Sequence, residues 1–412
     1  MREGWELKKL KEVCRFQNGF AFKSRTFRET GTPVVRITNI QAELVDLRKV
    51  VFIDRQDYDK DLSKYEIING DLLIAMSGAT TGKIGIHKSD EVLLLNQRVG
   101  KFEPLENLEK QYLFYFLSGK VEENLAISAG SAQPNLSTEQ INNFEIPIPP
   151  LKEQKQIVAL LDKAFTAIDQ AKANIEKNIA NAKELFQSKL NDIFSQKGAG
   201  WEEKTLNEIC EVKDGTHDSP KYIDEEFGIP FVTQKNILDD GISFEKTKFI
   251  SEEDHNNFYR RSNVAYNDIL FAMIGANRGM ACIVDDKRVF SIKNVGLIKS
   301  NESYRAKFIL YFLKSPRAKK YVAENSSGSA QGFIGLTKLR AFPVPFTSIE
   351  NQKEIELLIE SLNNSIKATI SNYTSKLNSL EELKKSILQK AFAGELTNQS
   401  AVGSNEFAVN IE

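Results

Sequence analysis

The string in the sequence that most resembles a catalytic motif is GATTGK at residues 78–83, which has the glycines and the lysine of a phosphate-binding loop. Such a loop requires four residues between its glycines and a serine or threonine after its lysine. Here three residues separate Gly78 from Gly82, and Ile84 follows Lys83. The string GANRGM at residues 275–280 has no lysine. A glycine-rich turn at a strand end is therefore favoured over a nucleotide site.

No other catalytic pattern is present in the sequence. We find no Ser/His/Asp set, no paired metal carboxylates and no dinucleotide fingerprint. The histidines are scattered, and three cysteines at Cys14, Cys210 and Cys282 indicate buried small apolar residues rather than a disulfide framework or a metal site. We therefore do not expect the chain to be an enzyme, and we expect it to bind no cofactor or metal of its own.

Polar and basic side chains are instead crowded into predicted turns. Arginine can contact guanine through two hydrogen bonds, asparagine or glutamine can contact adenine in the same way, and lysine can contact phosphate. The candidate DNA-binding residues of the first half of the chain are Lys23, Arg25, Arg36, Thr38, Thr80, Thr81, Lys83, Gln97, Arg98, Gln133 and Asn135. Those of the second half are Lys221, Thr233, Gln234, Lys235, Asn277, Arg278, Lys293, Asn294 and Gln331.

The alternative for each candidate is an ordinary solvated loop residue. Four further polar residues point more strongly to a structural role, because Asn and Asp often cap the backbone of their own turn. They are Asn39, Asp71, Asn236 and Asp268.

The candidates occur in two units that repeat the same order of landmarks. GWELKKLKEVC at residues 4–14 returns as GWEEKTLNEIC at 200–210, and NGDLLIAMSGATTG at 69–82 returns as YNDILFAMIGANRG at 266–279. GSAQ occurs at 130–133 and again at 328–331. Apolar and β-branched runs at 34–37, 72–75 and 92–95 predict strands, and 109–117 and 305–313 predict short helices. Each unit is therefore of mixed α and β structure, whereas the loops between the landmarks differ.

Each unit is followed by a long segment without proline or glycine, at residues 151–197 and 349–393. Apolar residues recur every three or four positions in both, from Ile157 to Leu185 and from Ile355 to Ile387. This spacing predicts two long helices with one apolar stripe each. Because such a helix needs a partner, each is expected to pack against the other.

The composition fits a soluble chain with two globular units. It has 412 residues, 41% of them hydrophobic and 27% charged, and a net charge of −1. No apolar run is long enough to cross a membrane and the start lacks a secretory signal, so we expect a cytoplasmic location. A net charge close to zero means that any DNA binding must come from local basic patches.

The order of these motifs resembles the specificity subunit of type I restriction-modification systems. The resemblance spans residue 4 to about residue 396, and its most specific part is IPIPPLKEQ at residues 146–154. In the second unit this string becomes FPVPFTSIENQ at 342–352, which departs from the pattern.

The resemblance implies an α+β fold with internal pseudo-two-fold symmetry. Target recognition domains at residues 1–150 and 199–347 would be separated by helices at 151–198 and 348–396 that pack as an antiparallel coiled coil, with a loose tail at 397–412. Each domain would read one half of a bipartite, asymmetric DNA sequence. Two methyltransferase (M) subunits would bind S-adenosylmethionine and methylate adenine, and restriction (R) subunits would use ATP and Mg²⁺.

Two rival functions remain open from the sequence. The duplicated units could form an assembly scaffold that binds proteins and never touches bases. The chain could also be a fused nuclease or methylase, although that function would require a nucleotide or metal motif that we do not find.

Overall fold

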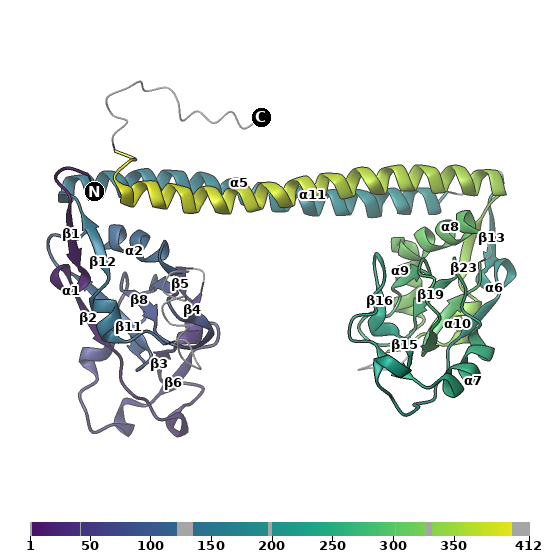
Figure 1. Cartoon of the computed structure of the whole chain (residues 1–412), viewed down its shortest axis with the longest axis horizontal. Coiled ribbons are helices and arrows are strands. Elements are labelled where there is room, and N and C mark those ends of the chain that lie inside the picture. Colours follow the sequence, from purple (N-terminus) through teal and green to yellow (C-terminus); the bar gives the residue numbers. More distant parts are fainter. Residues whose placement is uncertain are drawn as a thin grey trace. The chain divides into compact units, whose positions relative to one another are not determined.

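The computed structural model describes residues 2–41, 43–121, 135–196, 200–300, 302–326 and 332–397. The chain divides into two compact units, shown in Figure 1. The first comprises Met1–Asn174 together with Lys376–Glu412, and the second comprises Ile175–Ser375. Each unit therefore contains one mixed domain and a part of each long helix.

The two long segments are helical, as predicted. Helix α5 spans Leu151–Phe194 and helix α11 spans Ile349–Ala393, and both are labelled in Figure 1. Prolines at 147, 149 and 150 precede α5, and Pro343 and Pro345 precede α11. Because proline lacks a backbone N–H and restricts the residue before it, these segments stay extended until the helix begins.

In the first unit the start of α5 packs along the end of α11. Leu161 and Ile168 of α5 share a buried cluster with Leu388 and Ala391 of α11. Lys172 forms an ion pair with Glu381 across the same contact. Burial of these aliphatic side chains stabilises the pairing by roughly 25 cal/mol per Å² of apolar surface removed from water.

In the second unit the end of α5 packs along the start of α11. Leu190 and Phe194 of α5 are buried in one cluster with Ile359 of α11. The pairing of an end with a start in both units makes the two helices antiparallel, as expected.

Two residues of the predicted apolar stripes do not face a partner. Leu185 is 49% exposed and Leu383 is 45% exposed. An α-helix drifts by about 20° per heptad from a 3.5-residue repeat, so residues at the margin of a stripe turn outward along a long helix. Phe186 and Leu380 pack against the cores beside these positions instead.

The domain of the first unit is built on three hydrogen-bonded sheets. Their strand orders are β2-β11-β8-β9-β5-β4, β6-β3-β10-β7 and β1-β12. Strand β3 runs parallel to β10, whereas β8 and β2 run antiparallel to β11. The bounds are β1 Glu6–Lys9, β2 Cys14–Asn18, β3 Thr32–Val35, β4 Ile40–Gln41, β5 Glu43–Val45, β6 Val51–Ile53, β7 Glu66–Ile67, β8 Leu72–Ala75, β9 Ile84–Ile86, β10 Leu93–Leu95, β11 Val99–Pro104 and β12 Glu145–Ile148, with helices α1 Leu10–Val13, α2 Lys110–Ser118 and α4 Thr138–Asn142.

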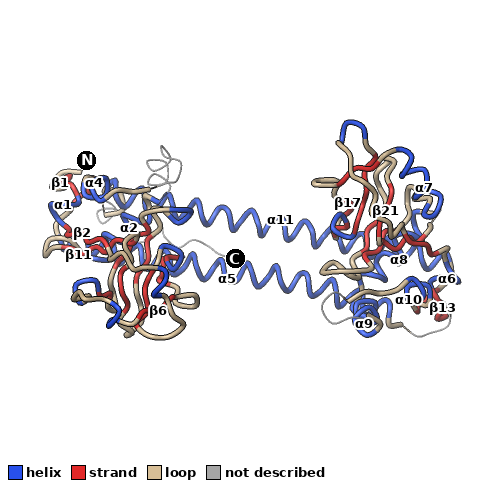
Figure 2. Tube along the Cα trace, turned by 90° about the horizontal axis from the view of Figure 1, so that it is seen from below, coloured by secondary structure: helices blue, strands red, loops and turns tan. Residues whose placement is uncertain are grey.

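The domain of the second unit repeats the central pairings. Its strand orders are β14-β22-β19-β20, β18-β15-β21, β13-β23 and β16-β17, and β15 runs parallel to β21 as β3 does to β10. The strands of each unit are drawn red in Figure 2. The bounds are β13 Glu202–Thr205, β14 Val212–Asp214, β15 Ile229–Thr233, β16 Ile237–Leu238, β17 Gly241–Ile242, β18 Lys248–Ile250, β19 Ile269–Ala272, β20 Ala281–Ile283, β21 Ser291–Lys293, β22 Val295–Ile298 and β23 Pro343–Phe346, with helices α6 Leu206–Ile209, α7 Glu252–Ser262, α8 Ser303–Lys314, α9 Pro316–Glu324 and α10 Leu336–Arg340.

A tyrosine connects each domain to the long helix that follows it. Tyr115 of α2 donates a hydrogen bond to the carboxylate of Asp162 on α5. Tyr311 of α8 donates at 2.7 Å to the carboxylate of Glu360 on α11. Burial and the neighbouring carboxylate raise the pKa of both tyrosines, so both hydroxyls keep their protons and remain donors.

The local predictions fit these elements closely. Strand β8 has the predicted bounds, but β3 ends at Val35, because Ile37 begins a 3₁₀ turn. A capping box begins α4, since the Ser137 amide donates to Gln140 Oε1 at 2.8 Å and the Gln140 amide donates to Ser137 Oγ at 3.1 Å. The predicted loose tail lies outside the described residues from position 398.

A search of the described helices finds none with the length and apolar character needed to span a lipid bilayer.

Candidate functional site

Most of the candidate residues in the first unit follow strands that end at one edge. Strands β3 and β10 are parallel, so Arg36 and Gln97, which follow their carboxyl ends, lie at the same edge. Strand β11 begins there as well, and its partner β8 ends there, because Val99 pairs with Ala75. We call the turns after β3, β8 and β10 the first edge; they comprise residues 36–39, 76–83 and 96–98.

Backbone hydrogen bonds join these turns into one surface. The Asn96 amide donates to the Val35 carbonyl at 3.2 Å, and the Met76 amide donates to the Arg98 carbonyl at 2.9 Å. Asn135 joins the edge through a bridge to Ser77. The Thr80 hydroxyl donates to the Ile37 carbonyl at 3.1 Å. Residues from four separate parts of the sequence thus meet at the first edge.

The candidates at the first edge differ in their exposure. Thr38, Gln97, Arg98 and Asn135 are exposed, and Arg36, Thr80 and Lys83 are half-buried. Thr81 is fully buried and donates to the Gly78 carbonyl at 2.7 Å, so it is a turn residue with no exposed surface for a ligand. The sequence-based assignment of Thr81 to a contact surface is therefore not supported by its position.

Lys23 and Arg25 lie in a different loop of the same unit. Both are exposed, and Arg25 is within the 3₁₀ turn Ser24–Thr26. The Lys23 amide donates to the Tyr58 hydroxyl at 3.3 Å, which ties this loop to the turn after β6.

Arg36 has a defined setting at the first edge. Its guanidinium carbon lies 5.8 Å from the centre of the Phe27 ring, in the range of a cation–π contact. Its Nε is buried and has no hydrogen-bond partner in the described structure. Buried donors are almost always paired in folded proteins, so this donor is one that a ligand could satisfy.

The second unit has an equivalent edge, which we call the second edge; it comprises residues 233–236, 273–279 and 293–294. Thr233 and Lys293 end the parallel strands β15 and β21, and the turn after β19 lies beside them. The Asn277 amide group donates to the Gln234 carbonyl at 3.2 Å. Lys235 is exposed, and Thr233, Gln234, Asn277, Arg278, Lys293 and Asn294 are half-buried.

A polar network that the sequence did not reveal adjoins the second edge at Asn294. His217 Nε2 lies 3.1 Å from Asp214 Oδ2, and His217 Nδ1 lies 2.6 Å from Asn294 Oδ1. Arg261 donates to the other oxygen of Asp214 at 2.7 Å. Asp214 is only 5% exposed, so its two partners compensate for the burial of a carboxylate. The available signal was that Asp214 ends β14, His217 follows three residues later, and Asn294 comes directly after β21.

The predicted turn caps are confirmed in both units. Asn39 accepts the Arg36 amide and Asn236 accepts the Thr233 amide, each at 2.9 Å. Asp71 accepts the Ile68 amide at 2.9 Å and Asp268 accepts the Ala265 amide at 2.8 Å.

Besides Lys23 and Arg25, three more candidates are not placed at either edge. Lys221 is exposed in the loop between β14 and β15. Gln133 and Gln331, which belong to the repeated GSAQ strings, lie outside the described residues.

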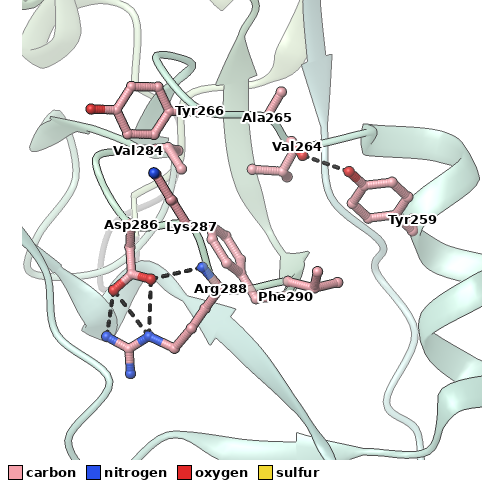
Figure 3. A pocket seen from close by; sticks show the side chains of 10 residues that line it. Tyr259, Val264, Ala265, Tyr266, Val284, Asp286, Lys287, Arg288 and Phe290 are labelled. Carbon is pink, nitrogen blue, oxygen red and sulfur yellow. Dashed lines mark hydrogen bonds and ion pairs between the residues drawn. The ribbon is translucent and has the colours of Figure 1, made fainter.

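A hollow of about 230 Å³ in the second unit lies away from the second edge, between the end of α7 and the loop that joins β20 to β21. In Figure 3, Asp286 and Arg288 are directed at each other, and the Tyr259 hydroxyl is directed at Val264. Arg288 forms hydrogen bonds with Asp286, and the Tyr259 hydroxyl donates to the Val264 carbonyl at 2.7 Å.

The arrangement of the edges suits hydrogen bonding and charge attraction. Among the described residues, no group of three or more His, Cys, Asp or Glu side chains could hold a metal ion. The three cysteines are buried, as predicted, and burial raises the thiol pKa of Cys14 and Cys282 to about 12 and that of Cys210 to about 11. A thiol that keeps its proton at neutral pH is a poor nucleophile.

The chain matches known proteins over most of its length. The family model described as type I restriction modification DNA specificity domain matches residues 2–181 and again 198–380. The specificity subunit of the type I restriction enzyme EcoBI from Escherichia coli is 28% identical, over 97% of this chain and 88% of that relative.

Two solved structures have the same fold. A chain from a study of complex assembly and conformational transition of the type I R-M system aligns with a TM-score of 0.73 at 19% identity, over 96% of this chain and 99% of that one. The HsdS subunit from Thermoanaerobacter tengcongensis aligns with a TM-score of 0.54 at 19% identity, over 96% and 98%. The two matches to the family model cover the domains of both units, and the chain therefore belongs to the type I restriction modification DNA specificity family.

Proposed function

We propose that this chain is the noncatalytic subunit that recognises DNA for a type I restriction-modification complex. Each unit contacts one half of a bipartite, asymmetric sequence through its edge. The observation that supports this proposal most is that the two edges have the same backbone plan but different side chains. The Thr80–Ile37 contact in one corresponds to the Asn277–Gln234 contact in the other.

The side chains at the edges are of the types that contact base edges and phosphates. Arg36 and Gln97 in the first unit are matched by Thr233 and Asn294 in the second, where the turn is one residue shorter because Val295 takes the place of Val99. Because amide, guanidinium and hydroxyl groups prefer different bases in the major groove, edges with different side chains read different half-sites. Phosphate contacts position such a protein on the duplex without adding sequence information.

Catalysis in this proposal belongs to partner subunits. Two methyltransferase subunits that bind S-adenosylmethionine methylate adenine in the sequence that this chain selects, and restriction subunits supply ATP- and Mg²⁺-dependent cleavage. Basic surfaces on these partners also supply part of the phosphate attraction, since the net charge of this chain is −1.

A competition assay tests the proposal. The chain in complex with its methyltransferase subunit is bound to a DNA site obtained by selection and is then challenged with unlabelled selected or random DNA. We expect random DNA to compete at least about 1,000-fold less well at physiological salt, as is typical of specific complexes. Equal competition would favour the rival function, a scaffold that binds only proteins.

The long helices act as a spacer in the same proposal. Insertion of seven residues into α5 near Ala171, with a matched insertion in α11, is expected to lengthen the unread gap between half-sites or to abolish binding. A gap of unchanged length after the insertions, measured by mapping methylated adenines, would rule out the spacer role.

A further inference from the structure

A second hollow, of about 200 Å³, lies in the second unit where the turn after β19 meets the ends of α8 and α9. Three cationic residues line it, namely Arg278, Lys314 and Lys319. One carboxylate, that of Asp239, lines it as well. Leu313 and Val322 supply an apolar wall, which lowers the local dielectric and strengthens electrostatic contacts inside the hollow.

The positive charge of this hollow is only partly compensated. Lys314 donates to the backbone carbonyl of Asp239 and pairs with its carboxylate at 3.3 Å, but the Asp239 side chain is 86% exposed, so solvent screens this ion pair. Lys319 donates at 2.8 Å to the amide oxygen of Gln187, which carries no charge. Among the residues that line the hollow, three are thus cations and one is a carboxylate.

Arg278 provides the most specific sign that the hollow can bind an anion. Its Nε is buried and has no hydrogen-bond partner within the described structure, where Arg278 also forms no ion pair. A buried, charged donor without an acceptor is costly, so the side chain is prepared for an acceptor from outside the chain. A guanidinium prefers planar, bidentate contact with phosphate or carboxylate oxygens.

The location of the hollow favours DNA over an acidic group of a partner protein. Arg278 directly follows Asn277, whose side chain holds the Gln234 carbonyl at the second edge. The hollow therefore adjoins the surface to which we assign base contacts. At the equivalent positions of the first unit, Thr81 replaces Arg278 and Ser118 replaces Lys314, so the two positions carry no cation there.

We propose that this hollow binds one backbone phosphate of the DNA at the second edge. This inference rests on the proposed function and refines it, because it assigns Arg278 to phosphate binding rather than to base recognition. The ligand is a phosphodiester oxygen pair, held by the guanidinium of Arg278 and by the ammonium groups of Lys314 and Lys319. Such a contact adds affinity for all sequences and makes binding depend on salt.

The test compares Arg278→Gln and Arg278→Lys in the complex with the methyltransferase subunit. Arg288→Gln is the matched control: it removes the same charge in the same unit, and Arg288 pairs with Asp286 and lies 3.7 Å from the Phe244 ring centre. Dissociation constants are measured over a range of salt concentrations for the selected site and for random DNA, and circular dichroism confirms folding.

We expect Arg278→Gln to weaken binding to selected and random DNA by the same factor. The slope of log affinity against log salt should become shallower by about 0.9, the value for one phosphate contact. Arg278→Lys should keep most of the slope, and Arg288→Gln should change neither quantity. Inorganic phosphate should raise the melting temperature of the wild-type chain above that in chloride of equal ionic strength, but not that of Arg278→Gln.

Other results would overturn the inference. A loss of affinity for the selected site alone would make Arg278 a base-reading residue. An unchanged salt slope would exclude a phosphate contact, and weaker binding of the methyltransferase subunit without DNA would indicate an acidic partner group in the hollow. These outcomes leave the proposed function intact, whereas it fails if the wild-type complex does not prefer selected over random DNA.

Discussion

The hydroxyl of Thr80 donates a hydrogen bond to the backbone carbonyl of Ile37, at 3.1 Å. The equivalent bond in the second unit runs from the Asn277 amide group to the Gln234 carbonyl, at 3.2 Å. A hydroxyl in the first unit thus holds the turn after β8 against the turn after β3, and an amide in the second unit holds the turn after β19 against the turn after β15. Different side chains thus hold the turns of the two edges in the same backbone arrangement. The residues beside Thr80 and Asn277 can therefore differ between the units.

Replacement of Thr80 by valine removes the donor and keeps the shape of the side chain. Because the Ile37 carbonyl would keep only the hydrogen bond from the Ile40 amide, we expect the free energy of unfolding of the first unit to fall by about 1 kcal/mol. Urea denaturation followed by circular dichroism measures this loss. Thr38→Val is the control, since Thr38 is exposed at the same edge, and an equal loss in both variants would contradict a specific role for the bond.

Arg36 is expected to read a base in the first half-site. Arg36→Lys keeps the charge but loses bidentate geometry, so discrimination at one base pair of that half-site should fall by about 1–3 kcal/mol. Selection of binding sites by the variant complex, followed by sequencing, measures the change.

Arg55→Lys is the control for Arg36, because Arg55 is committed to an ion pair with Glu66 at 2.7 Å. A uniform loss of affinity in Arg36→Lys, without relaxed discrimination at any position, would place Arg36 on a phosphate instead.

The tyrosine between each domain and its long helix should contribute to stability. Tyr311→Phe removes the hydrogen bond to Glu360, which Lys307 also approaches at 3.3 Å, and we expect a cost of about 1–2 kcal/mol. Tyr304→Phe is the matched control, because Tyr304 donates to Glu302 on the surface. Similar unfolding free energies for the two variants would show that the Tyr311–Glu360 hydrogen bond adds no more stability than a hydrogen bond on the surface.

The cysteines give the stability of the chain a defined pH dependence. Burial raises the pKa of all three thiols from 9.0 to about 11 or 12, so the folded chain retains these protons where the unfolded chain has lost them. Stability from this source is fully present below pH 9 and is lost as the pH rises towards 11 and 12.

Titration with a thiol reagent at pH 8 checks the same burial directly. We expect slow reaction in buffer and rapid reaction of all three cysteines in denaturant. Rapid modification of the native chain would contradict the burial of the thiols.

The sequence predicted the periodic and duplicated parts of the fold well. The long helix at Ile349–Ala393 has its predicted bounds, since an uninterrupted apolar stripe leaves few alternatives. The sequence did not predict that Leu383 faces outward. The spacing of apolar residues along the chain does not show how far their stripe rotates around a long, straight helix.

The candidate site was predicted less completely, because strand order decides which turns meet. Arg36 and Gln97 lie far apart in the sequence and share an edge only because β3 and β10 are parallel. The network of Asp214, His217 and Arg261 depends on a contact between β14 and α7 that no short motif announces. Thr81, in contrast, was predicted as a contact residue but is fully buried, because a turn can bury one of its own polar residues.

The independence of the two edges is the central claim, and one measurement tests it directly. Residues 15–135 are replaced by the same span of another member of the family, and methylated adenines are mapped across the host genome in the presence of the partner subunits. We predict that one half of the recognition sequence changes and the other half stays as it was. A change in both halves, or in neither, would contradict the account.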